Sequence, residues 1–120
     1  MAVVGVGVDV VDVARLERAL TRTPEMRSRV FADAEVSYAG GSIQRLAARF
    51  AAKEAVAKAL GAPARVRWRE IEVVVAADGR PSLVVTGQTA EVAAAAGVRS
   101  WHVSLTHDGG VAVAVVVAES

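Results

Sequence analysis

Valines alternate with small or acidic residues at the start of the chain, and this pattern predicts a β-strand over residues 2–11. Successive side chains of a strand point to opposite faces, so one face is purely aliphatic and consists of Val4, Val6, Val8 and Val10. The other face carries Gly5, Gly7 and Asp9. Two interpretations of this second face remain open. Either the glycines leave room for a ligand beside the carboxylate, or they permit close packing while Asp9 bonds backbone amides near the strand end.

An alanine-rich segment from Leu46 to Gly61 predicts the longest helix, with the glycine as its C-terminal cap. At about 100° per residue, Glu54 and Lys58 share one side of this helix. Two further charged residues fall within the aliphatic arc instead of opposite it, namely Arg49 and Lys53. The helix therefore has no clean solvated face, which favours burial, and buried charges need partners. The alternative is an ordinary amphipathic helix with a surface pair of Glu54 and Lys58.

The remaining segments mix helices with antiparallel hairpins. Further helices are predicted at Val13–Arg22, Ala34–Ala39 and 88–96, and a short turn or helix at Pro24–Val30. Candidate N-terminal caps are Asp12, Asp33 and Ser42. Strands are predicted at Trp68–Ala76, Pro81–Thr86, Trp101–Thr106 and Val111–Ala118. The turns of the two hairpins are Asp78-Gly79 and Asp108-Gly109-Gly110. This order of elements favours an α+β fold in a single domain over residues 1–120.

Composition adds an expectation of self-association and excludes several function classes. The chain is 53% hydrophobic with a mean hydropathy of +0.38, more apolar surface than a small monomer hides easily, which favours an oligomer. A net charge of +1 gives no reason to expect nucleic acid as a partner. The absence of cysteine excludes disulfides and thiolate metal sites. No apolar run approaches the roughly 20 residues of a membrane span, so we expect a cytoplasmic protein without a membrane partner.

Candidate chemistry lies in three places: Asp9 on the first strand, Glu54 with Lys58 on the long helix, and His107-Asp108 before the last turn. Two carboxylates without cysteine suit a hard cation, and Mg²⁺ typically binds one or two carboxylates together with substrate phosphates. Neighbouring lysine and arginine side chains suit phosphate oxygens. These groups together indicate metal-assisted phosphoryl or phosphodiester chemistry, provided that the fold brings Asp9 and Glu54 together.

A basic stripe accompanies the apolar stripe of the helix Val13–Arg22, and its members are Arg15, Arg18 and Arg22. Such a stripe is either a solvated face or a docking surface for an acidic partner.

Three blocks of the sequence resemble the holo-[acyl-carrier-protein] synthases, the small class of 4′-phosphopantetheinyl transferases. The blocks are GVGVDVVDVARL (Gly5 to Leu16), RFAAKEAVAKALG (Arg49 to Gly61) and WHVSLTHDGGVAVAVVVAE (Trp101 to Glu119), and DGRPSLVVTG (Asp78 to Gly87) also fits. The resemblance covers nearly the whole chain in order. One departure is the segment from Tyr38 to Arg45, which is shorter than expected for the family.

The resemblance implies an antiparallel sheet packed on a long central helix, assembled as a homotrimer with sites shared across subunit interfaces. It implies a Mg²⁺-dependent transfer of phosphopantetheine from coenzyme A to a serine of an apo acyl carrier protein, with release of adenosine 3′,5′-bisphosphate. The implied metal ligands are Asp9 and Glu54. Lys58 is implied to lie by the pyrophosphate and help orient or activate the serine. His107 is implied to lie near the coenzyme phosphates, and Asp108 follows it in part of the family.

Other roles follow from the resemblance with alternatives still open. Arg49 and Lys53 either hold outer phosphates of the coenzyme or stabilise the junction of helix and sheet. Arg80 either reaches the 3′-phosphate of a neighbouring subunit's coenzyme or is a solvated turn residue. The stripe of Arg15, Arg18 and Arg22 suits an acidic carrier, with Arg15 nearest the site in sequence.

Simpler interpretations apply to several of these residues and to the chain as a whole. His107 caps the turn in one interpretation, and Trp68 and Trp101 are packing residues in preference to a base-stacking platform. For function, the alternative is a non-catalytic module of the same fold that binds coenzyme A or a nucleotide. A fragment of an actin-like phosphotransferase is a weaker alternative, because the chain lacks a second phosphate loop.

Overall fold

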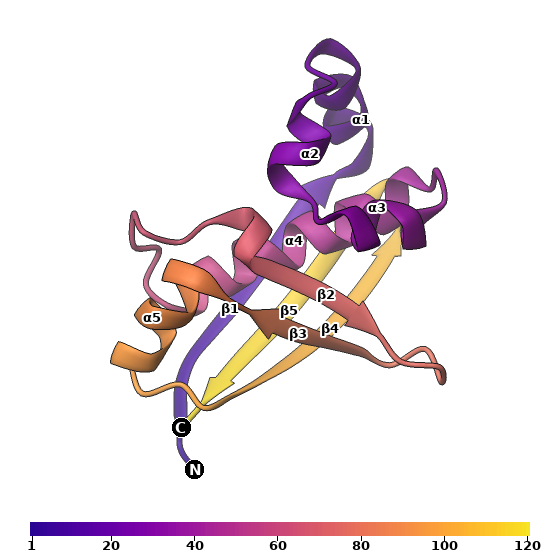
Figure 1. Cartoon of the computed structure of the whole chain (residues 1–120). Coiled ribbons are helices and arrows are strands. Elements are labelled where there is room, and N and C mark those ends of the chain that lie inside the picture. The colour runs from indigo at the N-terminus through magenta and orange to yellow at the C-terminus, as the bar shows by residue number, and fades with distance from the viewer.

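Two antiparallel sheets and five α-helices make up the computed structural model, which describes all 120 residues (Figure 1). A three-stranded sheet has the order β1-β5-β4 and is formed by β1 (Val3–Asp12), β5 (Val111–Glu119) and β4 (Ser100–Asp108). A separate two-stranded sheet is formed by β2 (Ile71–Val75) and β3 (Pro81–Val85). The helices are α1 (Val13–Arg22), α2 (Met26–Val30), α3 (Asp33–Ala39), α4 (Ile43–Ala59) and α5 (Gly87–Ala95), and a 3₁₀ turn, η1, spans Trp68–Glu70. The predicted α+β class with antiparallel sheets is confirmed.

The element boundaries differ from the predicted ones for identifiable reasons. Helix α4 begins three residues early because Ser42 accepts a hydrogen bond from the Arg45 amide at 3.3 Å, as expected of an N-cap. The first residues of the predicted strand Trp68–Ala76 instead form the turn η1. The predicted cap Asp33 is wrong, because it is the first residue of α3 and the N-cap position belongs to Ala32. The segment His107-Asp108, expected next to the turn, continues strand β4.

Helix α4 packs on the three-stranded sheet and has almost no solvated face, as predicted. Its buried residues are Leu46, Ala47, Ala48, Arg49, Ala51, Ala52, Lys53, Ala55, Val56 and Ala59. Toward its N-terminus α4 packs against α1, α2 and α3, and toward its C-terminus against β5 and β2, so that the two core clusters meet along one helix. No helix combines the length and the apolar character that crossing a bilayer requires.

Gly5 and Gly7 of β1 allow the strand backbone to touch the backbone of α4. A Cβ atom would lie 2.0 Å from the Ala59 carbonyl oxygen at Gly5 and 1.8 Å from the Ala55 carbonyl oxygen at Gly7. Neither position can hold a side chain unless the helix moves away from the strand. Of the two interpretations of these glycines, close packing is therefore correct and open space for a ligand is wrong.

The opposite face of β1 lies open. We call this surface the outer valine face; it consists of residues that are 37–60% exposed on β1 and β5, namely Val4, Val6, Val8, Val10 and Val115. Val8 pairs directly with Val115, so the side chains from the two strands lie side by side on one face. A contiguous apolar sheet face of this kind is typical of a surface that another chain covers.

Glu70 of η1 caps helix α5. Its carboxylate accepts hydrogen bonds from the Thr89 amide at 3.0 Å, the Thr89 hydroxyl at 2.9 Å and the Gln88 amide at 3.2 Å. These bonds favour the ionised form, so they lower the pKa of Glu70, with the Thr89 amide as the largest cause.

We expect Glu70→Gln to lower stability at neutral pH but not in acid. Because folding lowers the pKa of Glu70, its contribution is fully present above pH 4.5, the ordinary glutamate value, and is lost as the pH falls through the folded-state value. Urea unfolding at pH 7 and below pH 4 measures the gap between wild type and variant. Glu91→Gln, at an exposed residue 3.5 Å from Arg65, is the control and should show no comparable change. A gap that does not shrink in acid would contradict this assignment.

Candidate functional site

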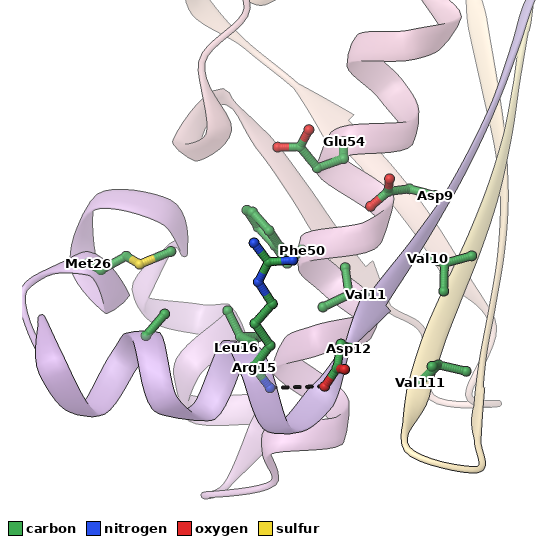
Figure 2. A pocket seen from close by; sticks show the side chains of 11 residues that line it. Asp9, Val10, Val11, Asp12, Arg15, Leu16, Met26, Phe50, Glu54 and Val111 are labelled. Atoms are coloured by element: carbon green, nitrogen blue, oxygen red, sulfur yellow. Dashed lines mark hydrogen bonds between the residues drawn. The ribbon is translucent and has the colours of Figure 1, made fainter.

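Asp9 and Glu54 line the same pocket, which has a volume of about 570 Å³ and lies between β1, α1, α2 and α4. Figure 2 shows both carboxylates on the pocket side of their elements, with the long side chain of Arg15 extending along the cavity. The other lining residues are Val10, Val11, Asp12, Leu16, Ala19, Met26, Phe50 and Val111. The fold therefore brings together the two acids that the sequence separates.

Lys58 joins these acids through Asp9. Its Nζ donates to the Asp9 carboxylate at 2.9 Å and to the Val8 carbonyl at 3.0 Å, and the lysine side chain remains 51% exposed. The alternative of a surface pair between Glu54 and Lys58 is wrong, because Lys58 bonds to Asp9 of β1 instead. The alternative in which Asp9 bonds backbone amides is also wrong, since Lys58 is its partner. The Lys58 side chain is therefore half-exposed to solvent, and its ammonium lies beside a carboxylate.

Glu54 has a different partner. Its Oε1 accepts a hydrogen bond of 2.7 Å from the indole Nε1 of Trp68, and Oε2 has no hydrogen-bond partner in the chain. Trp68 also packs on Phe50, with ring centroids 5.8 Å apart at a tilt of 56°. Trp68 thus packs on Phe50, as expected of a packing residue. It also donates a hydrogen bond to Glu54, which the sequence does not predict.

The chemistry of the pocket suits a cation that is shared with a substrate. No group of three or more histidine, cysteine, aspartate or glutamate side chains could hold a metal by protein ligands alone. Mg²⁺ does not need such a group, because it binds through one or two carboxylates and completes its shell with water and phosphate oxygens. Asp9 and the unbonded Oε2 of Glu54 fit that requirement.

His107 and Asp108 do not reach this pocket. Asp9 pairs with Ala114 of β5, whereas His107 pairs with the same strand from its other edge, at Ala112. His107 thus lies two strands across and two residues along from Asp9, roughly 12 Å away by strand spacing. Asp108 caps the following turn by accepting from the Gly109 amide at 2.8 Å. Within one chain, the predicted catalytic set therefore separates into Asp9, Glu54 and Lys58 on one side, and His107 and Asp108 on the other.

A second pocket, of about 290 Å³, collects candidate coenzyme-binding residues. Its lining includes Arg49 and Arg45 of α4, Tyr38 of α3 and His107 of β4. The Arg49 guanidinium lies 4.6 Å from the centre of the Tyr38 ring, and its buried Nε has no hydrogen-bond partner. Burial lowers the pKa of Arg49, and Glu35 partly opposes that effect. Arg80 is exposed and does not line this pocket, although its neighbours Gly79 and Pro81 do.

Lys53 is not available to a coenzyme phosphate. Its side chain is 0% exposed, and Nζ donates to Glu35 at 2.7 Å, to the Trp68 carbonyl at 3.1 Å and to the Ile71 carbonyl. Burial lowers the pKa of Lys53, and the Glu35 carboxylate acts in the opposite direction. Of the two roles left open for Lys53, it has the structural one at the junction of α4 with β2. Glu35 was not identified from the sequence, although a buried lysine requires a buried acid.

The basic stripe lies on the exposed side of α1, beside the pocket. Arg15, Arg18 and Arg22 are all exposed, while Leu16 and Leu20 of the same helix are buried. Arg15 is the only one of the three that lines the pocket of Asp9 and Glu54.

Comparison with known proteins assigns the chain to a family. The family profile described as the 4′-phosphopantetheinyl transferase superfamily matches residues 5–116. A holo-[acyl-carrier-protein] synthase of Frankia alni is 60% identical over 120 residues, with 100% of each chain covered. Among solved structures, the acyl carrier protein synthase of Mycobacterium tuberculosis superposes with a TM-score of 0.82 at 38% identity and covers 99% of each chain. The holo-[acyl-carrier-protein] synthase of Helicobacter pylori in complex with coenzyme A superposes with a TM-score of 0.86 at 26% identity, covering 95% of this chain and 99% of that chain. The chain therefore belongs to the 4′-phosphopantetheinyl transferase superfamily and, within it, to the holo-[acyl-carrier-protein] synthase enzymes.

Proposed function

We propose that this chain is a cytoplasmic enzyme that uses Mg²⁺ to move phosphopantetheine from coenzyme A to a serine of an acyl carrier protein, with release of adenosine 3′,5′-bisphosphate. The observation that carries the proposal is the shared pocket of Asp9 and Glu54, with Lys58 bonded to Asp9. The family assignment supports the same reaction, and the Helicobacter pylori relative is described with coenzyme A bound.

The residues of the pocket suit each part of that reaction. The serine oxygen forms a bond to the β-phosphorus of coenzyme A while the bond to the α-phosphate oxygen breaks, and the leaving nucleotide takes the negative charge. Asp9 and Glu54 would hold Mg²⁺, which would supply charge neutralisation on the diphosphate. Lys58 adds a positive charge on the same side and orients the phosphate. The serine proton passes to a carboxylate or to solvent.

We further propose that the enzyme works as a homotrimer. Within one chain, the pocket of Asp9 and Glu54 is separate from the pocket of Arg49 and His107. If one coenzyme binds to both sets of residues, as proposed, the two sets would come from different chains. The outer valine face offers an apolar surface for a second copy, which would supply the second set from a neighbouring subunit. His107, Arg49 and Arg80 are then coenzyme-binding residues of the assembly.

Val8→Lys is expected to shift the protein from trimer to monomer. The substitution puts a charge in the middle of the outer valine face, where Val8 is 52% exposed in the single chain. Light scattering measures the mass in solution. Val84→Lys is the matched control, because Val84 is a strand valine of similar exposure, 46%, outside that face. A wild-type monomer, or a Val8→Lys trimer, would contradict the proposed assembly.

The exposed arginines of α1 are proposed to bind the carrier. Arg15, Arg18 and Arg22 present positive charge next to the pocket, which suits an acidic protein that must deliver its serine there. Arg15 connects the two functions, because it belongs both to the stripe and to the pocket wall.

A transfer assay tests the proposed reaction. The protein is incubated with coenzyme A, MgCl₂ and apo acyl carrier protein, and the carrier is weighed by mass spectrometry. We expect one phosphopantetheine arm per carrier, and no transfer when EDTA replaces MgCl₂. Binding of coenzyme A without a change in the carrier would favour the non-catalytic module instead.

A further inference from the structure

Trp68 is bonded through its backbone carbonyl and its indole N–H to two consecutive residues of α4. Its backbone carbonyl accepts from the buried ammonium of Lys53 at 3.1 Å, and its indole Nε1 donates to Glu54 at 2.7 Å. The residue as a whole is 43% exposed. Burial of the ring alone therefore does not account for the place that Trp68 occupies.

The turn that carries Trp68 is anchored at every residue. Lys53 holds the Trp68 carbonyl and is itself fixed by Glu35, which also accepts from the Val73 amide at 3.0 Å. The Arg69 guanidinium donates to the Phe31 carbonyl at 2.7 Å, and Glu70 holds the start of α5. Three successive residues are thus attached to different elements, and this makes η1 a rigid support.

The side chain of Trp68 is fixed as well as its backbone. The indole ring of Trp68 packs against Phe50, which lines the pocket of Asp9 and Glu54. The indole N–H is a donor only, so its bond to the Glu54 carboxylate has one possible direction. Hydrogen bonds to an ionised acceptor are short and strong, and 2.7 Å is typical of that class.

We propose that Trp68 is a positioning residue that holds Glu54 for the divalent cation. The inference rests on the proposed function. The indole N–H occupies Oε1 of Glu54 and restrains the rotation of a half-buried side chain, which leaves Oε2 available for a cation shared with Asp9. Donors in this position orient metal ligands, and losing one weakens metal binding by about 10–100-fold in other proteins.

Mn²⁺ binding to Trp68→Phe tests the proposal without relying on activity. Phenylalanine keeps a ring against Phe50 but has no N–H. Electron paramagnetic resonance counts free Mn²⁺ in the presence of coenzyme A, and we expect the variant to bind Mn²⁺ about tenfold more weakly than wild type. Trp101→Phe, at the other tryptophan of the chain, is the matched control and should bind like wild type. In the transfer assay, Trp68→Phe should need more Mg²⁺ for half-maximal rate and regain most of its rate at saturating Mg²⁺.

A second pair of variants tests whether Trp68 acts through Glu54. Glu54→Asp keeps a carboxylate but draws it back from the indole, so adding Trp68→Phe to it should cause no further loss of Mn²⁺ affinity. Equal affinity of Trp68→Phe and Trp101→Phe, or a full additional loss in the Glu54→Asp background, overturns the positioning role even if transfer is normal. Failure of the wild-type protein to bind Mn²⁺ overturns this inference and the metal assignment together. A lower melting temperature with unchanged Mn²⁺ affinity would show that Trp68 is structural only.

Discussion

Glu54→Gln is expected to lower the rate of phosphopantetheine transfer about a thousandfold or more, because a bound cation supplies several kcal/mol of charge stabilisation and each 1.4 kcal/mol is about a factor of ten. Glutamine has nearly the same shape, and its amide oxygen can still accept the Trp68 indole N–H. The variant therefore removes the charge and keeps the geometry. Mass spectrometry of the carrier against time, at saturating coenzyme A, measures the rate.

The control for Glu54→Gln must separate loss of the metal from loss of the fold. Glu54 is only half-buried and takes part in no salt bridge, so the melting temperature should change little. Glu91→Gln, an exposed glutamate on α5, should transfer at the wild-type rate. Wild-type activity of Glu54→Gln would show that the carboxylate pair does not hold the cation.

Lys53→Met is expected to lower the free energy of unfolding by about 3–5 kcal/mol, because breaking a fully buried ion pair leaves one charge without a partner. The Glu35 carboxylate would keep its bonds to the Ala32 and Val73 amides but lose its salt-bridge partner. The carbonyls of Trp68 and Ile71 would lose a donor as well. For a chain of this size the loss corresponds to a fall in melting temperature of roughly 10–20 °C, which calorimetry measures.

Two further variants make the Lys53 experiment decisive. Lys58→Met changes the chain's other lysine, which is half-exposed on the same helix, and should cost less than about 1 kcal/mol. Adding Glu35→Gln to Lys53→Met removes the charge left behind, so part of the loss should be recovered. A single variant Lys53→Met as stable as Lys58→Met would contradict the assigned role of the pair.

Local patterns were sufficient to predict most of the elements. Alternation in β1, the alanine-rich register of α4 and the caps Asp12 and Ser42 all depend on neighbours in sequence, and each appears in the structure. Burial of Arg49 and Lys53 followed from their angular positions on the helix. The turn η1 was missed because three residues of 3₁₀ helix carry no periodic signal of their own.

The partners of the site residues could not be read from the sequence, because they are contacts between distant elements. The helix pattern predicts a contact between Glu54 and Lys58, which are four residues apart. In the structure, Lys58 bonds to Asp9 and Glu54 bonds to Trp68. Lys53 finds its acid on α3, at Glu35, where no local pattern marks one. The family resemblance identifies candidate site residues but not their arrangement. The structure places Asp9 and Glu54 in one pocket, and Arg49 and His107 in another.

The contact between β1 and α4 through Gly5 and Gly7 has a consequence for how the enzyme can vary. Main chain meets main chain there, so the separation between the strand that bears Asp9 and the helix that bears Glu54 does not depend on which aliphatic side chains fill the interior. The hydrophobic residues around this contact between β1 and α4 can therefore be substituted during evolution while Asp9 and Glu54 keep their separation. A methyl group added at Gly7 would push β1 away from α4 and so increase the separation of Asp9 and Glu54. We therefore expect no other residue at position 7 in an active enzyme.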